Sequence, residues 1–243
     1  NNSGYTGAVT LNANADLSLT NSAALSSANN LAFSAGTGRA ALYLFGQSVT
    51  IGNLSDSGAG TRYIRNGARN TTNAGTNTTG GGLVALGVNA DSVLTITQSS
   101  AGSFGGVISD GPNDDALGTS ATDYRKLGIV KAGAATLTLT GTNTYTGGTT
   151  VNAGGLSISN SSALGTGAIN YTAVGTSLTI TGTAVTLANN IALPTSGTGN
   201  VTLATPNNSA TILNGVISGG AAGTVLFFQG GASGQNTGAL TLN

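Results

Sequence analysis

The chain has 243 residues, of which 39% are hydrophobic and 40 are glycine, and seven basic residues balance seven acidic ones. It contains no cysteine, methionine, tryptophan, histidine or glutamate. A chain this apolar is expected to fold, and its neutral balance excludes a basic surface for nucleic acid or for anionic membranes. No apolar run approaches the length of a membrane helix, so we expect no membrane insertion of this segment.

The charges are confined to the first half of the chain. All of them lie between Asp16 and Lys131, and the residues from Ala132 to Asn243 carry none. A solvated protein surface normally carries about a quarter charged residues. The uncharged half must instead be wetted by threonine, serine and asparagine, which give little repulsion between copies. This composition favours association of the chain with itself.

The N-terminal part resembles a later part of the same chain. Residues 1–35 and 131–170 are interpreted as degenerate copies of one internal repeat, because Tyr5-Thr6-Gly7 in the first matches Tyr145-Thr146-Gly147 in the second. Internal similarity of this kind is typical of solenoid proteins.

A departure from the strand pattern follows. Residues 61–82 are rich in glycine, asparagine and threonine, and they predict a loop that projects from one side of the fold. The stretch bears four candidate partner-contact residues: Arg62, Tyr63, Arg65 and Arg69. One interpretation is a contact site for an anionic glycan or for a neighbouring chain. The other is a solvated loop whose arginines keep it soluble, since exposed loops vary freely.

A cluster of oxygen-bearing side chains comes next, in residues 110–115. Asp110, Asp114 and Asp115 are weak candidates for a calcium loop, since carboxylates are hard oxygen ligands. The cluster lacks both the EF-hand spacing and the nonapeptide of calcium-binding β-rolls. The alternative is a polar turn in which these side chains cap their own backbone.

Residues 131–158 show the organisation most clearly. Three short apolar segments, Leu137–Leu139, Val151 and Leu156–Ile158, are separated by glycine and asparagine. They recur too quickly for helices or for long strands. Each segment offers about two inward apolar residues, so no turn of chain buries its own core and each must stack on another. The sequence therefore predicts an all-β solenoid with three short strands per coil.

A family resemblance rests on the ungapped stretch from Lys131 to Leu156, K-x-G-x-x-T-L-T-L-T-G-x-N-T-Y-T-G-G-T-T-V-N-A-G-x-L. This stretch is similar to the passenger-associated strand repeat of bacterial autotransporter proteins. The G-V-I-S lead-in of that pattern occurs at residues 106–109 and again at 215–218. The resemblance implies a right-handed parallel β-helix that is exported to the cell exterior. It implies no catalytic site, because the repeat is a scaffold element.

The two ends of the chain carry the same element. Thr237–Asn243 repeats Thr6–Asn12 with one conservative change, so residues 232–243 are interpreted as a further repeat start. We expect residues 1–243 to form one continuous β-helix segment of a longer chain or of a fibre. Neither end shows a capping helix or a charged edge. The residues expected to mediate end-on assembly are Tyr5, Val9, Leu11, Leu240 and Leu242.

These features favour a non-enzymatic extracellular module that is structural or adhesive and stacks head to tail into a filament. We expect no catalytic residue and no cofactor, because the catalytic triads need residues the chain lacks and glycoside hydrolysis would have aspartate alone. The alternative is a monomeric passenger adhesin that binds glycans or host and abiotic surfaces. A lesser alternative is an ice or crystal-surface binder, suggested by the row Thr136, Thr138 and Thr140; it requires a flat threonine array over several coils.

Overall fold

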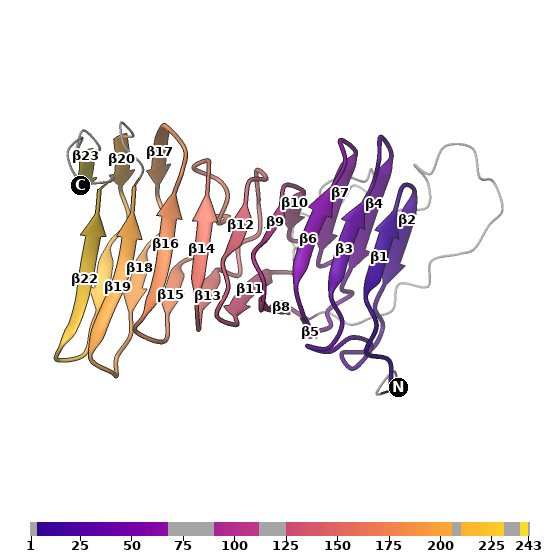
Figure 1. The fold of residues 1–243 in the computed structure, drawn as a ribbon, viewed down its shortest axis with the longest axis horizontal. Coiled ribbons are helices and arrows are strands. Elements are labelled where there is room, and N and C mark those ends of the chain that lie inside the picture. Colours follow the sequence, from indigo (N-terminus) through magenta and orange to yellow (C-terminus); the bar gives the residue numbers. More distant parts are fainter. Residues whose placement is uncertain (1–3, 68–89, 112–124, 206–209, 231–238, 243) are drawn as a thin grey trace.

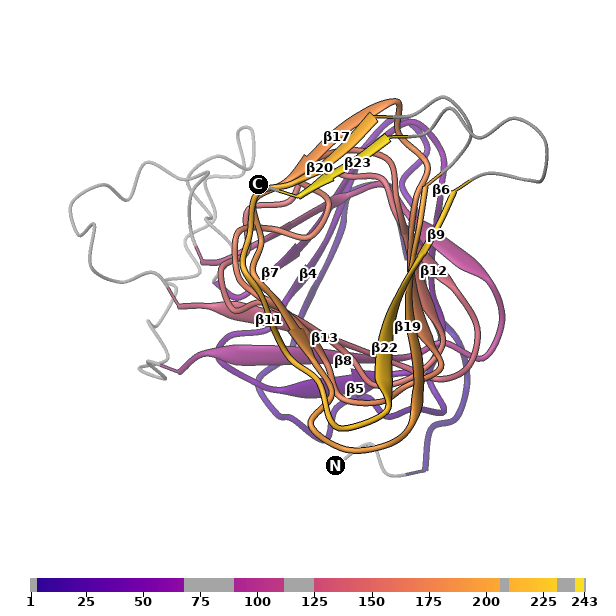
Figure 2. The same cartoon turned by 90° about the vertical axis from the view of Figure 1, so that its left-hand side faces the viewer.

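The fold is a stack of short parallel strands. The computed structural model of the protein describes residues 4–67, 90–111, 125–205, 210–230 and 239–242. Every regular element in these ranges is a β-strand, and every strand pair is parallel. The strands follow one another along a single long axis (Figure 1), and the view down that axis shows faces arranged around a common interior (Figure 2). The chain is a parallel β-helix, as predicted.

The strands lie on three faces, which the chain visits in a constant order. The first face holds β1 (Val9–Asn12), β3 (Leu31–Ser34), β6 (Leu54–Ser57), β9 (Gly102–Phe104), β12 (Leu137–Leu139), β14 (Gly155–Ile158), β16 (Thr176–Ile180), β19 (Gly199–Ala204) and β22 (Thr224–Gln229). The second holds β2 (Ala15–Ser18), β4 (Arg39–Tyr43), β7 (Thr61–Arg65) and β10 (Val107–Ser109), and further along the axis β17 (Ala184–Leu187), β20 (Ala210–Leu213) and β23 (Ala239–Leu242). The third holds β5 (Val49–Ile51), β8 (Ser92–Thr97), β11 (Leu127–Ala132), β13 (Thr149–Val151), β15 (Ile169–Tyr171), β18 (Ile191–Leu193) and β21 (Ile217–Gly219).

The number of strands per coil varies, and the predicted three are not formed in every coil. In the coils that begin with β12 and β14, residues 143–145 and 162–164 occupy the second face without forming a strand. They still stack, since Thr144 N donates to the carbonyl oxygen of Ile108 in β10, and Asn143 N donates to that of Ser162. These coils are short: Leu137 pairs with Leu156, 19 residues later. A short coil has no room for a strand on the second face, and side chains fill the interior at that position instead.

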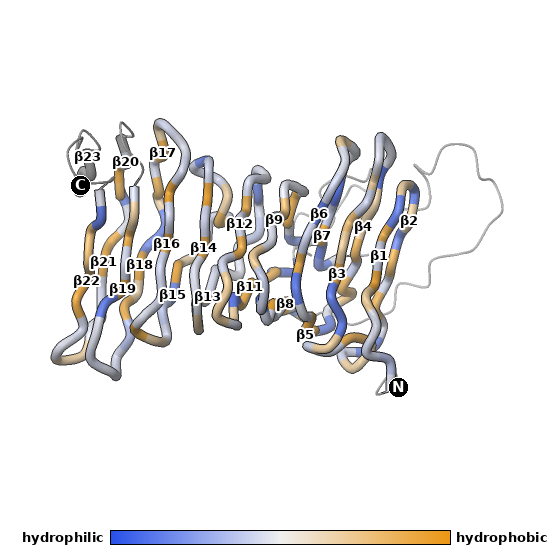
Figure 3. The backbone as a smooth tube through the Cα atoms, in the orientation of Figure 1, coloured by the Kyte–Doolittle hydropathy of each residue, from blue (hydrophilic) through white to orange (hydrophobic). Residues whose placement is uncertain are grey.

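The interior consists of columns of apolar side chains along the axis. Leu137, Leu156 and Leu178 stand in register on the first face, and each is fully buried. Figure 3 shows hydrophobic residues recurring along the strands. A strand supplies only about two inward residues and cannot bury them by itself. Each side chain in a column is therefore covered by the coils before and after it. Burying such a side chain contributes about 1.5–3 kcal/mol, and the stack as a whole therefore makes the core.

A side chain replaces the backbone ladder at one place on the first face, between β6 and β9. The carboxamide of Gln98, fully buried, accepts a hydrogen bond from Leu54 N (3.0 Å) and donates to Leu54 O (3.3 Å) and Ser100 O (2.9 Å). An amide side chain offers the same donor and acceptor as a peptide group. Gln98 thus satisfies a strand edge that no backbone pairs.

The first residues of the loop predicted for residues 61–82 form a strand instead. Its first five residues form β7, which pairs with β4 and β10. The alternation of Tyr63 and Arg65 with buried Ile64 is a strand pattern, and the neighbouring glycines and asparagines obscured it. The rest of the predicted loop, from residue 68 on, lies outside the described residues.

The two predicted repeat copies occupy different faces. β1 opens the first face, beside β3, whereas its sequence counterpart β13 lies on the third face between β11 and β15. A short strand followed by a sharp turn serves equally on any face, because each face offers the same apolar interior. Within the described ranges, no helix is long and apolar enough to cross a bilayer.

Candidate functional site

The residues around β11 to β14 contain a buried charge. Lys131 stands in the inward column of the third face, between Ile96 and Val151, and is fully buried. Its ammonium donates to the carbonyl oxygens of Ala132 (3.0 Å), Gly133 (2.8 Å) and Ala153 (3.0 Å). All three N–H donors of the ammonium therefore have acceptors. Burial lowers the pKa of Lys131 to about 8.

An aromatic ring fills the interior where the second face has no strand. Tyr145 is fully buried, and its hydroxyl lies 2.6 Å from Oγ1 of Thr149, which is buried as well. Burial raises the pKa of Tyr145, so the phenol stays neutral at ordinary pH. The glycine that follows Thr146 turns the chain tightly: a Cβ on Gly147 would lie 2.6 Å from the backbone of Leu127 and Gly128.

One asparagine joins three coils at this point. Asn143 is buried; its Oδ1 accepts a hydrogen bond from Ile108 N (2.8 Å), and its Nδ2 donates to Ala163 O (2.6 Å). The coil before and the coil after are thereby held to the coil that contains Asn143. The arrangement is a structural joint in which the buried polar groups of Lys131, Tyr145 and Asn143 all have hydrogen-bond partners.

Comparison with known families identifies this joint. Residues 129–158 match the passenger-associated-transport-repeat. The match spans Tyr145, Asn143 and Lys131 and confirms the predicted resemblance of residues 131–156. Comparison with curated proteins and with solved structures gave no match. The passenger-associated-transport-repeat is thus one segment of a longer β-helix here, extending from β11 to β14.

Asp110, the first of the three metal candidates, is hydrogen-bonded to the repeat. Asp110 is buried; its Oδ1 accepts hydrogen bonds from Leu127 N (2.7 Å) and Thr146 N (3.1 Å), and its Oδ2 accepts one from Thr146 Oγ1 (2.7 Å). The carboxylate therefore joins its own coil to the repeat. Asp114 and Asp115 lie outside the described residues. Among the residues that the structure does describe, no group of three acidic, histidine or cysteine side chains is placed to hold a metal ion.

Arg62, the first of the predicted partner-contact residues, has its partners within the chain. Arg62 lies 2.8 Å from Asp56 through Nε, and both side chains are largely buried. A terminal nitrogen of Arg62 also donates to the carbonyl oxygens of Gly58 and Gly60. This arginine is held by its own coil.

Tyr63 and Arg65 take the outward positions of β7, where Tyr63 is half-buried and Arg65 is buried. Arg69 lies outside the described residues. The guanidinium carbon of Arg65 stands 4.1 Å from the centre of the Tyr63 ring, an attractive cation–π arrangement. Beside them on the second face lie an ion pair of Arg39 with Asp16 (2.6 Å) and a hydrogen bond from Arg39 to Tyr43 (3.0 Å). This charged and aromatic group was not expected, because its members are far apart in sequence and meet only by stacking of coils.

Arg62→Ala is expected to lower the free energy of unfolding by about 1–3 kcal/mol. The substitution removes the cation beside Asp56, which keeps only its hydrogen bond from Gly105 N, and leaves two carbonyl groups without this donor. Denaturant unfolding of the variant, compared with the parent chain, measures this, and equal stability of the two would show that the Arg62 contacts contribute nothing.

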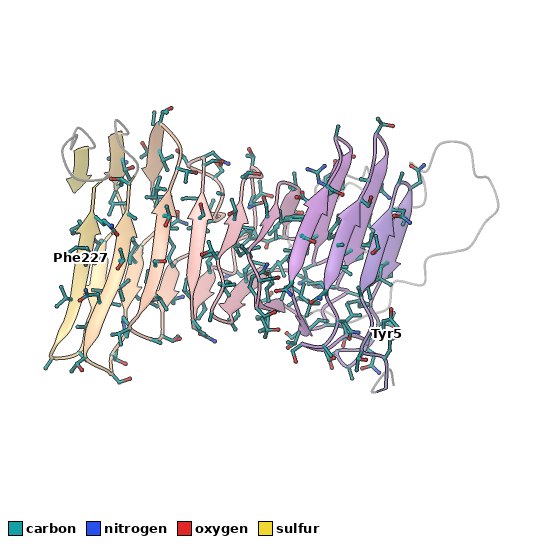
Figure 4. The ribbon with its side chains drawn as sticks, in the orientation of Figure 1. Tyr5 and Phe227 are labelled. Carbon is teal, nitrogen blue, oxygen red and sulfur yellow. The ribbon has the colours of Figure 1, made fainter. Side chains whose placement is uncertain are left out.

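The predicted end-contact residues belong to the two ends of the stack, where β1 and β23 lie (Figure 1), and Figure 4 shows Tyr5 at the end opposite Phe227. Tyr5 is exposed and donates its hydroxyl proton to Ala8 O (2.7 Å), Val9 is half-buried, and Leu11 is buried. Leu240 and Leu242 belong to β23 and pair with β20 on the second face. β1 is on the first face, so the strand that ends the same face is β22 and not β23.

Strand β22 carries an exposed apolar surface. Leu226 and Phe228 pair with the buried residues Val201 and Leu203, so both point inward. Phe228 is nevertheless 39% exposed, and Phe227, which points outward, is 46% exposed.

The threonine row does not extend across coils. Thr138 pairs with Ser103 on one side and with Ser157 on the other. Further along the same outward column stand Thr179 and then Ala204. The flat threonine array that an ice-binding surface requires is not formed on these coils.

Proposed function

We propose that this chain is a non-enzymatic structural module of an autotransporter-type passenger, working at the bacterial cell exterior as a stiff spacer. The observation that supports the proposal most is the stacking of coils around one apolar interior, with the passenger-associated-transport-repeat inside the stack. Backbone ladders along all three faces resist bending and limit access of proteases to the strands. The absence of His, Cys and Glu from the sequence fits a role without catalysis.

The module extends by end-on addition of a second copy. Leu226 and Phe228 offer the next positions of the first-face columns, and the inward residues of β1, Val9 and Leu11, have the matching spacing. In such a stack β22 meets β1 of the next copy, and β23 meets β2. A head-to-tail contact of this kind continues into a filament unless its rotation closes a ring. The uncharged C-terminal half presents no repulsion to it.

Phe228→Asp is expected to weaken end-on assembly about tenfold to a hundredfold, because a Phe side chain contributes about 1.5–3 kcal/mol when buried. The matched control is Phe227→Asp, which places the same charge on the outward side of the same strand. Light scattering over a range of concentrations, with electron microscopy of the particles, measures assembly of the isolated chain.

Unfolding midpoints of both variants separate loss of assembly from loss of fold. Rods longer than one copy, shortened by Phe228→Asp and much less by Phe227→Asp, support the proposal. A monomer at every concentration, or equal effects of both substitutions, contradicts end-on stacking while leaving the spacer role intact.

Glycan binding by a monomeric passenger adhesin is the second candidate. The group of Tyr63, Arg65 and Arg39 favours it, because an aromatic ring beside guanidinium groups suits sugars with acidic substituents. Its accessible members are Arg39 and the half-buried Tyr63, since Arg65 is buried. Binding of the isolated chain to an array of anionic glycans, compared with Tyr63→Ala and Arg39→Ala, tests this candidate. Arg62 is unsuited to the test because it is held by Asp56.

A further inference from the structure

Apolar packing in the interior of this β-helix does little to determine which coil stacks on which. The inward columns of the third face consist mostly of aliphatic residues that pack alike. One column runs through Val49, Leu94, Ile129, Thr149, Ile169, Ile191 and Ile217, and the other through Ile51, Ile96, Lys131, Val151 and Tyr171, so the exceptions are Thr149, Lys131 and Tyr171. At most of these positions, a strand that skipped one coil and paired with the following one would still bury aliphatic against aliphatic. Looping out about 20 residues adds little to the entropy of closure. Apolar burial by itself therefore discriminates weakly between the correct stack and a stack with one coil omitted.

Lys131 interrupts this uniformity. The residue is fully buried in the column between Ile96 and Val151, and its ammonium reaches carbonyl oxygens at the ends of the strands. Two of its three acceptors, at the last residue of β11 and in the turn that follows, belong to its own coil, and the third, Ala153 O, belongs to the turn that follows β13 in the next coil. The third acceptor is present only when β13 lies directly beside β11.

We propose that Lys131 fixes the register of the stack, by ensuring that only the pairing of β11 with β13 satisfies its buried ammonium. In a stack that skips this coil, Tyr171 of β15 takes the place of Val151 beside Lys131 and the ammonium loses Ala153 O. An incompletely paired buried charge costs several kcal/mol. The device resembles the single buried asparagine that sets register in coiled coils, where one polar residue excludes the alternatives that apolar packing tolerates.

The chain is suited to a direct test because it contains no cysteine. Val130 of β11 pairs with Thr150 of β13, and Thr150 pairs with Asn170 of β15; all three are half-buried on the outer side. Neighbouring strands lie about 4.8 Å apart and strands two positions apart about 9.6 Å. A disulfide requires Cα atoms within about 7 Å. The pair Val130→Cys with Thr150→Cys thus reports the correct register, and Val130→Cys with Asn170→Cys reports the skipped coil.

Each cysteine pair is refolded from urea, oxidised and analysed by peptide mapping, with Lys131 present or replaced by Met. With Lys131 we expect the Cys pair at 130 and 150 to form and the pair at 130 and 170 to remain reduced. Lys131→Met is expected to raise the yield of the second disulfide at least about tenfold. Ile129→Met, a substitution in the neighbouring column of the same strand, is the matched control and is expected to behave like the parent.

Equal yields in Lys131→Met and Ile129→Met would overturn the proposal and leave Lys131 with a role in stability alone. If Lys131→Met does not refold, Lys131→Gln replaces it, since the amide removes the charge and retains two donors. An intermediate yield of the skipped-coil disulfide in Lys131→Gln supports the proposal, and an unchanged yield contradicts it.

Discussion

Tyr145→Ala is expected to destabilise the β-helix by about 3–5 kcal/mol, the usual result of deleting a large buried aromatic side chain. The ring is fully buried in a coil that has no strand on its second face. The coil is too short to supply another side chain for that space, so the cavity cannot close by local rearrangement. Denaturant unfolding followed by circular dichroism measures the loss.

Tyr145→Phe separates the ring from its hydroxyl. It keeps the packing and leaves Oγ1 of the buried Thr149 without the partner at 2.6 Å, which is expected to lower the free energy of unfolding by about 1–2 kcal/mol. If the alanine and phenylalanine variants lost equal stability, the hydrogen bond and not the ring would support this coil.

Asp110→Ala is expected to lower the free energy of unfolding by a similar amount, about 3–5 kcal/mol. The substitution leaves the buried Leu127 N and two partly buried donors of Thr146 without an acceptor. Because those donors belong to two successive coils, we expect proteolysis to begin near the start of the repeat. Limited proteolysis with mass mapping, alongside thermal unfolding, measures both effects.

Asp110→Asn is the matched control for this carboxylate. The amide keeps one acceptor oxygen for the backbone donors and is expected to cost about 1–2 kcal/mol. A calcium site would instead raise the unfolding temperature of the parent when calcium is added. The hydrogen bonds of Asp110 lead us to expect no change with calcium or with a chelator, and a calcium-dependent rise would restore the metal hypothesis.

Short-range patterns in the sequence predicted much of the fold. The apolar pair Leu137 and Leu139 and the segment Leu156–Ile158 became β12 and β14 as predicted, because alternation and flanking glycines are local properties of the chain. The same rule failed at β7, where Tyr63 and Arg65 took the outward positions of a strand that was read as a loop. Outward positions tolerate any residue type, so composition is a poor guide to them.

Contacts between coils could not be predicted from the sequence. Asp110 was read as a turn residue or as a metal ligand, yet its three donors come from residues 127 and 146. Lys131 was noted only as part of a motif, and its third acceptor lies 22 residues further along. Such partners depend on the length of each coil, which the residue types alone do not reveal.

By itself the sequence determined that this protein is a solenoid of short strands, because two inward residues per strand cannot form a core without neighbours. It also determined the location of the repeat and the confinement of charge to the first half of the chain. Only the tertiary structure decided which face each strand occupies and which buried polar groups meet. The physical reason is that burial is a property of each strand, whereas a hydrogen bond between coils requires two distant segments to arrive at the same height on the axis.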